Sequence, residues 1–330
     1  MDSSTTSLML HAADLIRGAT TPAAFAGSFH ALLRQELEAG NPELSPAEQD
    51  QLRSHYPTLM SPHRFAPALV TTIYCQRRAP AVAAILAQRE PVVLDAGCGY
   101  GSESFLFAAA GGRVLAVDYS AEQVAIARKR QAFYERHLGV PLEIEFSAAD
   151  LDVYTPTGRD LSLTWLASVL AAIQDQEGLL RRIHDATRDD GELMVTDMNL
   201  LNPLFLVKEW RRRQGLKAVS SEFASQASYL DMVRRRGRRG ARYYRRDRQG
   251  HVDDVQFFRP GTLARLFRRS GFAPQPPTFS GFAPPFSIGI DPAISERSLA
   301  RIPGLNRFGY FYLMRGCRTD LPRSRGEGRQ

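Results

Sequence analysis

The chain has 330 residues, 44% of them hydrophobic, and a formal net charge of +7 at pH 7. This length can bury one large core with an appended domain, and no apolar run approaches the roughly 20 residues that a membrane-spanning helix needs. The start of the chain lacks the basic region of a signal peptide, and the three cysteines include no metal-type pair. We therefore expect a cytoplasmic protein with no membrane span and no metal site.

The first 88 residues are predicted to form a helical region ahead of the core. Phe25, Phe29 and Leu33 recur at helical spacing, and Leu69 and Ile73 do so again further on. Such stripes indicate packing faces of helices. Residues 1–88 exceed what a fold needs before its first strand, so we expect them to act as a cap.

Strands and helices can be followed through residues 89–200. Predicted strands cover 92–95, 114–117, 142–146, 160–168 and 192–197, and predicted helices follow the first strand and cover 120–137 and 177–187. These residues are predicted to form the core of the fold.

Residues 201–259 are predicted to form an insertion after the fifth strand. They include the segment Arg234–Arg248, which holds nine arginines against one aspartate and carries a charge of +8, whereas the rest of the chain carries −1. The strands 241–247 and 252–258 look like a β-hairpin around a turn. The basic patch is therefore either a surface for phosphate groups or the solvated face of a hairpin.

Residues 260–318 are predicted to complete the core. An amphipathic helix covers 260–271 and a buried strand covers 307–317. The polar residues 319–330 are expected to be a disordered tail.

The most informative stretch is the glycine turn that follows the first predicted strand. Asp95 ends that strand, and Gly97, Gly99 and Gly101 follow at every second position. Because glycine has no side chain, a ligand can lie directly on such a backbone. Asp118 comes 17 residues after Gly101, at the end of the next strand, where an acid usually binds ribose hydroxyls. This pattern predicts a cofactor that contains a nucleoside.

The spacing disfavours a dinucleotide. Dinucleotide sites use G-x-G-x-x-G, but Ser102 stands where the third glycine belongs. In addition, Asp95 would repel a pyrophosphate, whereas it suits a cofactor that carries an ammonium and a sulfonium. NAD is therefore a distant alternative.

The sequence from Asp95 to Gly101 resembles motif I of class I S-adenosylmethionine-dependent methyltransferases, and Asp118 matches the acid of their motif II. The resemblance implies an α/β fold with a Rossmann-like, doubly wound sheet of seven strands. It also implies a cap over the cofactor (1–88), a cofactor-binding core (89–200), a lid insertion (201–259) and a completion of the core (260–318). The residues that it assigns to S-adenosyl-L-methionine are Asp95, Gly97, Cys98, Gly99, Gly101, Asp118, Tyr119, Asp150, Leu151 and Leu166.

The family has no universal catalytic residue, because the cofactor already carries an excellent leaving group and the protein mainly aligns the nucleophile. Several specialised signatures of the family are missing here; residues 165–168, for example, replace the Asn/Asp-Pro-Pro-aromatic run of adenine and glutamine N-methyltransferases. Any base must come from the substrate side. Position alone makes His63, Tyr74 and Asn199 the candidates.

The leading hypothesis is methyl transfer to an oxygen or nitrogen of a small molecule, such as a natural-product or glycan intermediate. One alternative is an RNA methyltransferase that binds phosphates through Arg234–Arg248. Another is a non-catalytic scaffold with the same fold. The sequence indicates no oligomeric state, and the fold alone does not select the acceptor.

Overall fold

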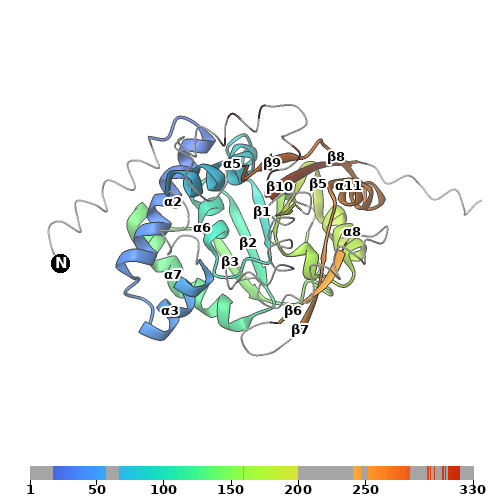
Figure 1. Ribbon diagram of the computed structural model, residues 1–330. Coiled ribbons are helices and arrows are strands. Elements are labelled where there is room, and N and C mark those ends of the chain that lie inside the picture. Colours follow the sequence, from blue (N-terminus) through green and yellow to red (C-terminus); the bar gives the residue numbers. More distant parts are fainter. Residues whose placement is uncertain are drawn as a thin grey trace, which may run out of the picture.

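The computed structural model describes residues 18–56, 67–158, 160–199, 241–246, 252–282 and 311–319, together with positions 296, 298, 301, 307 and 309. Within these residues a central sheet lies between two groups of helices (Figure 1). Predicted site residue His63 and most of the arginine-rich segment lie outside the described residues.

The sheet has the strand order β3-β2-β1-β4-β5-β10-β8, and an eighth strand, β9, pairs with β10 beside β8. The parallel strands are β1 (Val92–Ala96), β2 (Arg113–Asp118), β3 (Ile144–Ala148), β4 (Leu161–Ala167) and β5 (Thr187–Met198). The antiparallel part comprises β8 (Phe272–Pro274), β9 (Thr278–Ser280) and β10 (Phe311–Arg318). The chain runs outward from β1 in one direction and then, from β4, in the other. This confirms the predicted doubly wound α/β fold, which puts the ends of β1 and β4 side by side.

Several strand limits differ from the predicted ones. β5 begins at Thr187, whereas the sequence suggests residue 192, because the early residues pair with β4 through a register shift between Leu161 and Leu163. β3 ends at Ala148, two residues later than predicted. Both differences concern residues outside the most apolar part of the strand. The sequence pattern is weak at such residues.

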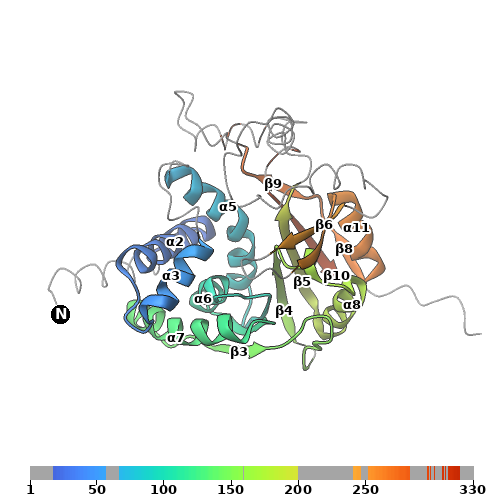
Figure 2. The ribbon, with the colours of Figure 1, turned by 60° about the horizontal axis from the view of Figure 1, so that its bottom comes forward.

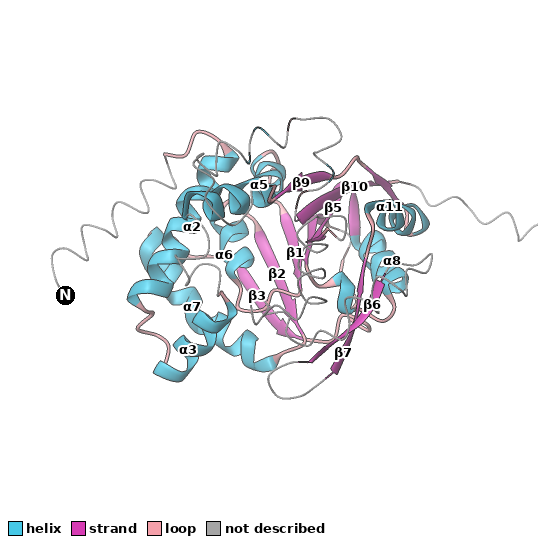
Figure 3. Cartoon of the chain, viewed as in Figure 1, coloured by secondary structure: helices cyan, strands magenta, loops and turns pink. Residues whose placement is uncertain are grey.

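Helices cover both faces of the sheet (Figures 2 and 3). One core cluster joins the sheet to α2 (Pro22–Ala39), α5 (Pro67–Leu86), α6 (Ser102–Ala109) and α7 (Ala121–Leu138). A second joins the other face to α8 (Gln176–Ala186) and α11 (Pro260–Arg269). A smaller cluster links α2 to the segment around α3 (Pro46–His55). The described part of the N-terminal region is therefore helical and packs on the same face as α6 and α7.

Local sequence explains where these helices begin. Ser45 and Glu48 form a reciprocal capping box at the start of α3. Thr21 caps α2 through the N–H of Ala24, and Ser120 caps α7 through the N–H of Gln123. The caps of α2 and α7 stand before apolar stripes that face the core, whereas α3 buries only Leu52.

The predicted hairpin is present in the backbone: β6 (Ala241–Arg246) pairs antiparallel with β7 (Val252–Phe257).

Near the C-terminus, Thr319 is anchored, since its N–H donates to the carbonyl of Gly271 at 2.9 Å. Residues 320–330 lie outside the described residues. The domain limits given above remain predictions. None of the described helices is both long and apolar enough to cross a membrane.

Candidate active site

The glycine turn lies at the carboxyl end of β1 and leads into α6. Gly97, Gly99 and Gly101 have φ values of 81°, 52° and 82°, a region that favours glycine. A Cβ on Gly97 would lie 2.1 Å from Cγ2 of Val169, which follows β4. The turn therefore needs glycine both for its backbone conformation and for its packing against the β4 loop.

Four N–H groups of this turn have acceptors inside the protein. Those of Gly97 and Cys98 donate to the carbonyl of Val117, and that of Gly101 donates to the carbonyl of Cys98. The N–H of Gly99 donates to Oδ2 of Asp118 at 2.9 Å. A pyrophosphate site needs such N–H groups to point at the ligand. The observed turn instead fits a nucleoside cofactor whose chain carries no phosphate.

Asp118 lies at the end of β2, directly beside the turn. Its carboxylate accepts hydrogen bonds from the N–H groups of Gly99 and Ser120, each at 2.9 Å. A carboxylate has about four acceptor positions, so each oxygen keeps one for a ribose hydroxyl. The turn and Asp118 thus form one hydrogen-bonded unit.

The end of β3 joins the same edge of the sheet. Ala149 donates its N–H to the carbonyl of Asp118 at 2.9 Å. The next residue, Asp150, is exposed and therefore lies close to the end of β2. Leu151 is buried in the core beside Val117, whereas Tyr119 is 78% exposed. Asp150 and Tyr119 are therefore exposed at this edge, and their role in cofactor binding remains a prediction.

Two other predicted cofactor residues are buried. The Leu166 side chain is fully buried in the cluster that packs on α8, so only its backbone lies near the β1 end, where it pairs with Ala96. Cys98 is also buried, and burial raises the pKa of its thiol. Cys98 is thus a neutral thiol that fills space under the turn.

Asp95 lies beneath the turn, where it is 2% exposed and accepts a hydrogen bond from Oγ of Ser104 at 2.6 Å. Burial, and next the nearby charge of Glu103, raise the pKa of Asp95 to about 8. The fold therefore favours the protonated carboxyl near neutral pH, although the charge of Arg78 opposes this in part. A positively charged ligand over the turn would favour the carboxylate.

Charged residues from α5 and α6 lie near Asp95. Arg78 on α5 donates to Glu103 on α6 at 2.9 Å and lies over the ring of Tyr74, 3.8 Å from its centroid. Arg77 donates from Nε to Oγ1 of Thr196 on β5 at 3.2 Å. The N-terminal region thereby contributes side chains next to the turn.

The catalytic candidates are placed as follows. Tyr74 is 8% exposed, and burial raises the pKa of its hydroxyl, so it is a neutral phenol and not a base at neutral pH. Asn199 donates its amide N–H groups to the carbonyls of Arg307 and Gly309 at 2.9 and 2.8 Å, which gives it a structural role before β10. A catalytic role of His63, Tyr74 or Asn199 remains a prediction.

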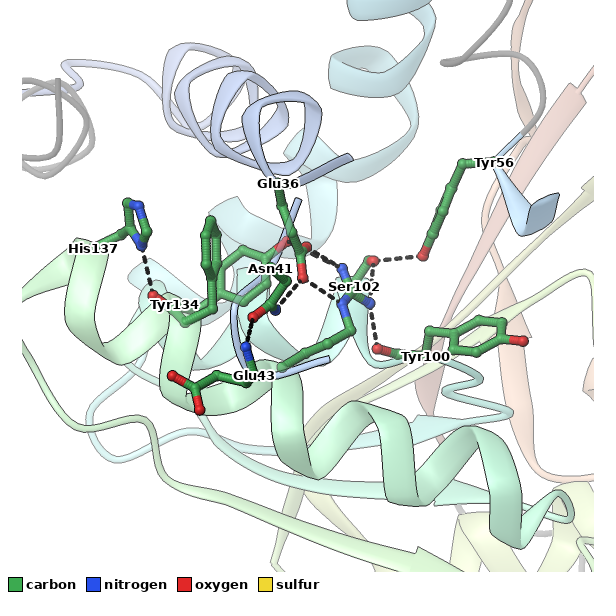
Figure 4. A network of polar contacts seen from close by, with 10 residues as sticks. Glu36, Asn41, Glu43, Tyr56, Tyr100, Ser102, Tyr134 and His137 are labelled. Atoms are coloured by element: carbon green, nitrogen blue, oxygen red, sulfur yellow. Dashed lines mark hydrogen bonds and ion pairs between the residues drawn. The ribbon is translucent and has the colours of Figure 1, made fainter. Parts of the chain in front are cut away.

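A buried ion pair between α7 and α2 contacts the turn (Figure 4). Arg130 on α7 donates to both carboxylate oxygens of Glu36 on α2 and also to the carbonyl of Tyr100 within the turn. Tyr134 and Asn41 donate to the same carboxylate. Burial opposes both charges, but their mutual attraction and hydrogen bonds prevail and lower the pKa of Glu36. This network is not apparent from the sequence, because its members are far apart in the chain.

The fold, the turn and Asp118 together define a cofactor-dependent α/β enzyme with its site at the carboxyl edge of the sheet. The sequence model of a family described as a methyltransferase domain matches residues 71–275, more than half of the chain. The protein therefore belongs to this methyltransferase family, and its cofactor is S-adenosylmethionine. The turn residues, with their internally satisfied N–H groups and the acid beneath them, fit this cofactor.

Solved structures with a similar fold include three methyltransferases. The S-adenosylmethionine-dependent enzyme from Mesorhizobium loti is 18% identical, with a TM-score of 0.44, over 73% of this chain and 98% of that one. The 1,6-didemethyltoxoflavin-N1-methyltransferase from Burkholderia thailandensis is 21% identical, with a TM-score of 0.43, over 85% and 93%. A methyltransferase from Methanosarcina mazei is 13% identical, with a TM-score of 0.47, over 71% and 95%. No curated protein sequence matches the chain.

Proposed function

We propose that this methyltransferase transfers the methyl group to an oxygen or nitrogen of a small molecule. The observation that carries the proposal is the position of α5. Arg78 on this helix donates to Glu103 at the start of α6 and lies over the ring of Tyr74, and Arg77 donates to Thr196 near the carboxyl end of β5. Helices packed this closely on the site favour a small acceptor over a large one.

The reaction is an in-line displacement at the methyl carbon, and the bound cofactor supplies an activated methyl group with a neutral thioether as the leaving group. The protein must hold the acceptor in line and keep water away. The fixed turn, the Asp118 carboxylate and the packed α5 supply alignment. Tyr74 is a neutral phenol with a buried hydroxyl, so it does not remove a proton at neutral pH.

The alternative acceptor is RNA, bound by the arginine-rich segment. In the β6–β7 hairpin, Arg245 pairs in register with Asp253, and Arg242 pairs with Gln256. The register establishes the backbone of the predicted hairpin, and the nine arginines against one aspartate in Arg234–Arg248 are the observation behind this alternative.

The test is a screen for methyl transfer from isotopically labelled S-adenosylmethionine, read as a mass shift of each acceptor. The panel contains small hydroxy and amino compounds beside total RNA, and Asp118→Ala is the negative control. The proposal predicts labelled small molecules and unlabelled RNA. Labelled RNA, bound with a steep salt dependence that is lost when Arg234–Arg239 are replaced, would overturn it.

A further inference from the structure

Arg77 has an unusual environment for an arginine at the edge of a site. Its Nε donates to Thr196, and its guanidinium carbon lies 4.0 Å from the centroid of the Phe311 ring. Thr196 is on β5 and Phe311 begins β10, where it pairs with Met198. The guanidinium is therefore held against the end of these two strands.

No described carboxylate lies within ion-pair distance of Arg77. Its neighbour Arg78 has Glu103 as a partner, whereas Asp197 and Glu103 attract Arg77 only from a longer range. Burial, and next the charge of Arg78, lower the pKa of Arg77 to about 9. Asp197 compensates little, because burial raises its own pKa to about 7. The positive charge at this position is thus only partly balanced.

Arg77 is partly exposed, and its contacts within the described part of the chain leave its terminal nitrogens unused. They have no hydrogen-bond partner among the described residues, because the contact with Thr196 is made by Nε. Because Nε is occupied and Phe311 covers one face of the guanidinium, the edge formed by the two Nη atoms is the part left for a ligand. That edge presents two parallel N–H groups, the geometry that matches a carboxylate.

A short series of contacts connects Arg77 to the cofactor turn. Gly97 packs against Val169, the preceding Ser168 donates its N–H to the carbonyl of Thr196 at 2.9 Å, and Thr196 contacts Arg77. The cofactor residues Asp118 and Gly97 stand at the ends of β2 and β1, whereas Arg77 stands at β5 and β10. Arg77 therefore lies on the part of the edge that is left for the acceptor.

From this geometry we infer that the methyl acceptor carries a carboxylate and that Arg77 binds it through its two Nη atoms. This inference rests on the proposed function and specifies its substrate class. The acceptor is a hydroxy or amino carboxylic acid, whose carboxylate pairs with Arg77 while its oxygen or nitrogen lies toward the turn.

The experiment uses the full chain, with Arg77→Gln and Arg77→Lys as variants. Arg113→Gln is the matched control, since Arg113 is half-exposed at the start of β2, at the opposite edge of the sheet. Aromatic and aliphatic hydroxy and amino acids are offered as acceptors, each beside the carboxamide of the same skeleton. Binding of S-adenosylhomocysteine and of 5′-methylthioadenosine, which lacks the amino-acid group, is measured in parallel.

We expect acids to be methylated and their carboxamides to be poor acceptors. Loss of a charge-assisted pair should raise KM for the acid roughly 10- to 100-fold in Arg77→Gln. Because lysine keeps the positive charge, the rise in KM should be smaller in Arg77→Lys. Affinity for S-adenosylhomocysteine should stay unchanged in both, and Arg113→Gln should behave as the wild type.

Three results would overturn the inference: equal methylation of acids and carboxamides, binding of S-adenosylhomocysteine without methylation of any acid, or a change of KM that does not depend on the acceptor's carboxylate. If Arg77→Gln weakens S-adenosylhomocysteine but not 5′-methylthioadenosine, Arg77 binds the cofactor's carboxylate instead, which also overturns it. No binding of S-adenosylhomocysteine at all would contradict the proposed function itself, and this inference with it.

Discussion

Arg130 and Glu36 form a bidentate ion pair in which both side chains are fully buried, with N–O distances of 2.9 and 2.6 Å. The pair joins α7 to α2, and the same guanidinium holds the carbonyl of Tyr100 in the glycine turn. The N-terminal helices are thus connected to the glycine turn by charge as well as by apolar packing.

Replacing Arg130 with Met should destabilise the protein by about 3–5 kcal/mol, because it leaves the Glu36 carboxylate buried without its partner. The double variant Glu36→Met/Arg130→Met should recover part of this loss, since no unpaired charge remains. Urea unfolding of the wild type, both single variants and the double variant measures the difference. Equal stability of Arg130→Met and the wild type would contradict the described pair.

Gly97→Ala should abolish cofactor binding and lower stability, because the new Cβ would meet Val169 in a backbone conformation that disfavours alanine. Gly111→Ala is the matched control. Gly111 has a φ of 94°, but a Cβ added there would have nothing within 4 Å, so its variant isolates the conformational cost. Calorimetric binding of S-adenosylhomocysteine and thermal unfolding compare the two. Similar losses of cofactor affinity and of Tm in both variants would mean that the contact with Val169 is unimportant.

The glycine turn and Asp118 could be predicted from the sequence because their pattern is local: an apolar strand, a glycine turn and an acid at the next strand end. The apolar runs also located the buried strands. β9, with three residues, is too short to give a periodic signal, and its pairing with β10 depends on the rest of the fold.

The charged residues of the site could not be predicted in the same way. Glu36 and Arg130 are 94 positions apart, and each alone resembles a surface residue of an amphipathic helix. Arg77 and Arg78 likewise resemble a solvated helix face until β5, β10 and α6 are placed around them. Such pairings depend on tertiary contacts that the sequence pattern does not contain.

Cofactor binding should release a fraction of a proton near neutral pH. The pKa of Asp95 is raised to about 8 without ligand, and a cationic group over the turn should lower it, so the carboxyl loses its proton on binding. Titrations with S-adenosylhomocysteine at pH 7 in buffers of different ionisation enthalpy measure this release, which should disappear in Asp95→Asn. Identical heats in all buffers would show that Asp95 does not respond to the cofactor.

Asp197→Asn should stabilise the cofactor-free protein increasingly as the pH rises. Burial raises the pKa of Asp197 from 3.8 to about 7 in the folded protein, so the fold favours the neutral form, and this contribution is lost as pH rises through about 7. The Tm difference between variant and wild type should therefore grow between about pH 4 and 7 and then level off. A difference that stays constant across this range would show that Asp197 is ionised when folded.

The most direct test of the cofactor site is calorimetric titration of the protein with S-adenosylmethionine and S-adenosylhomocysteine, repeated on Asp118→Ala. Asp160→Ala is the control, because Asp160 is a half-exposed acid paired with Arg113 away from the turn. We predict saturable binding that Asp118→Ala abolishes and Asp160→Ala preserves, with both variants folded by thermal unfolding. Unchanged binding in a folded Asp118→Ala, or no binding by the wild type, would contradict the assignment of the glycine turn and Asp118 as the cofactor site.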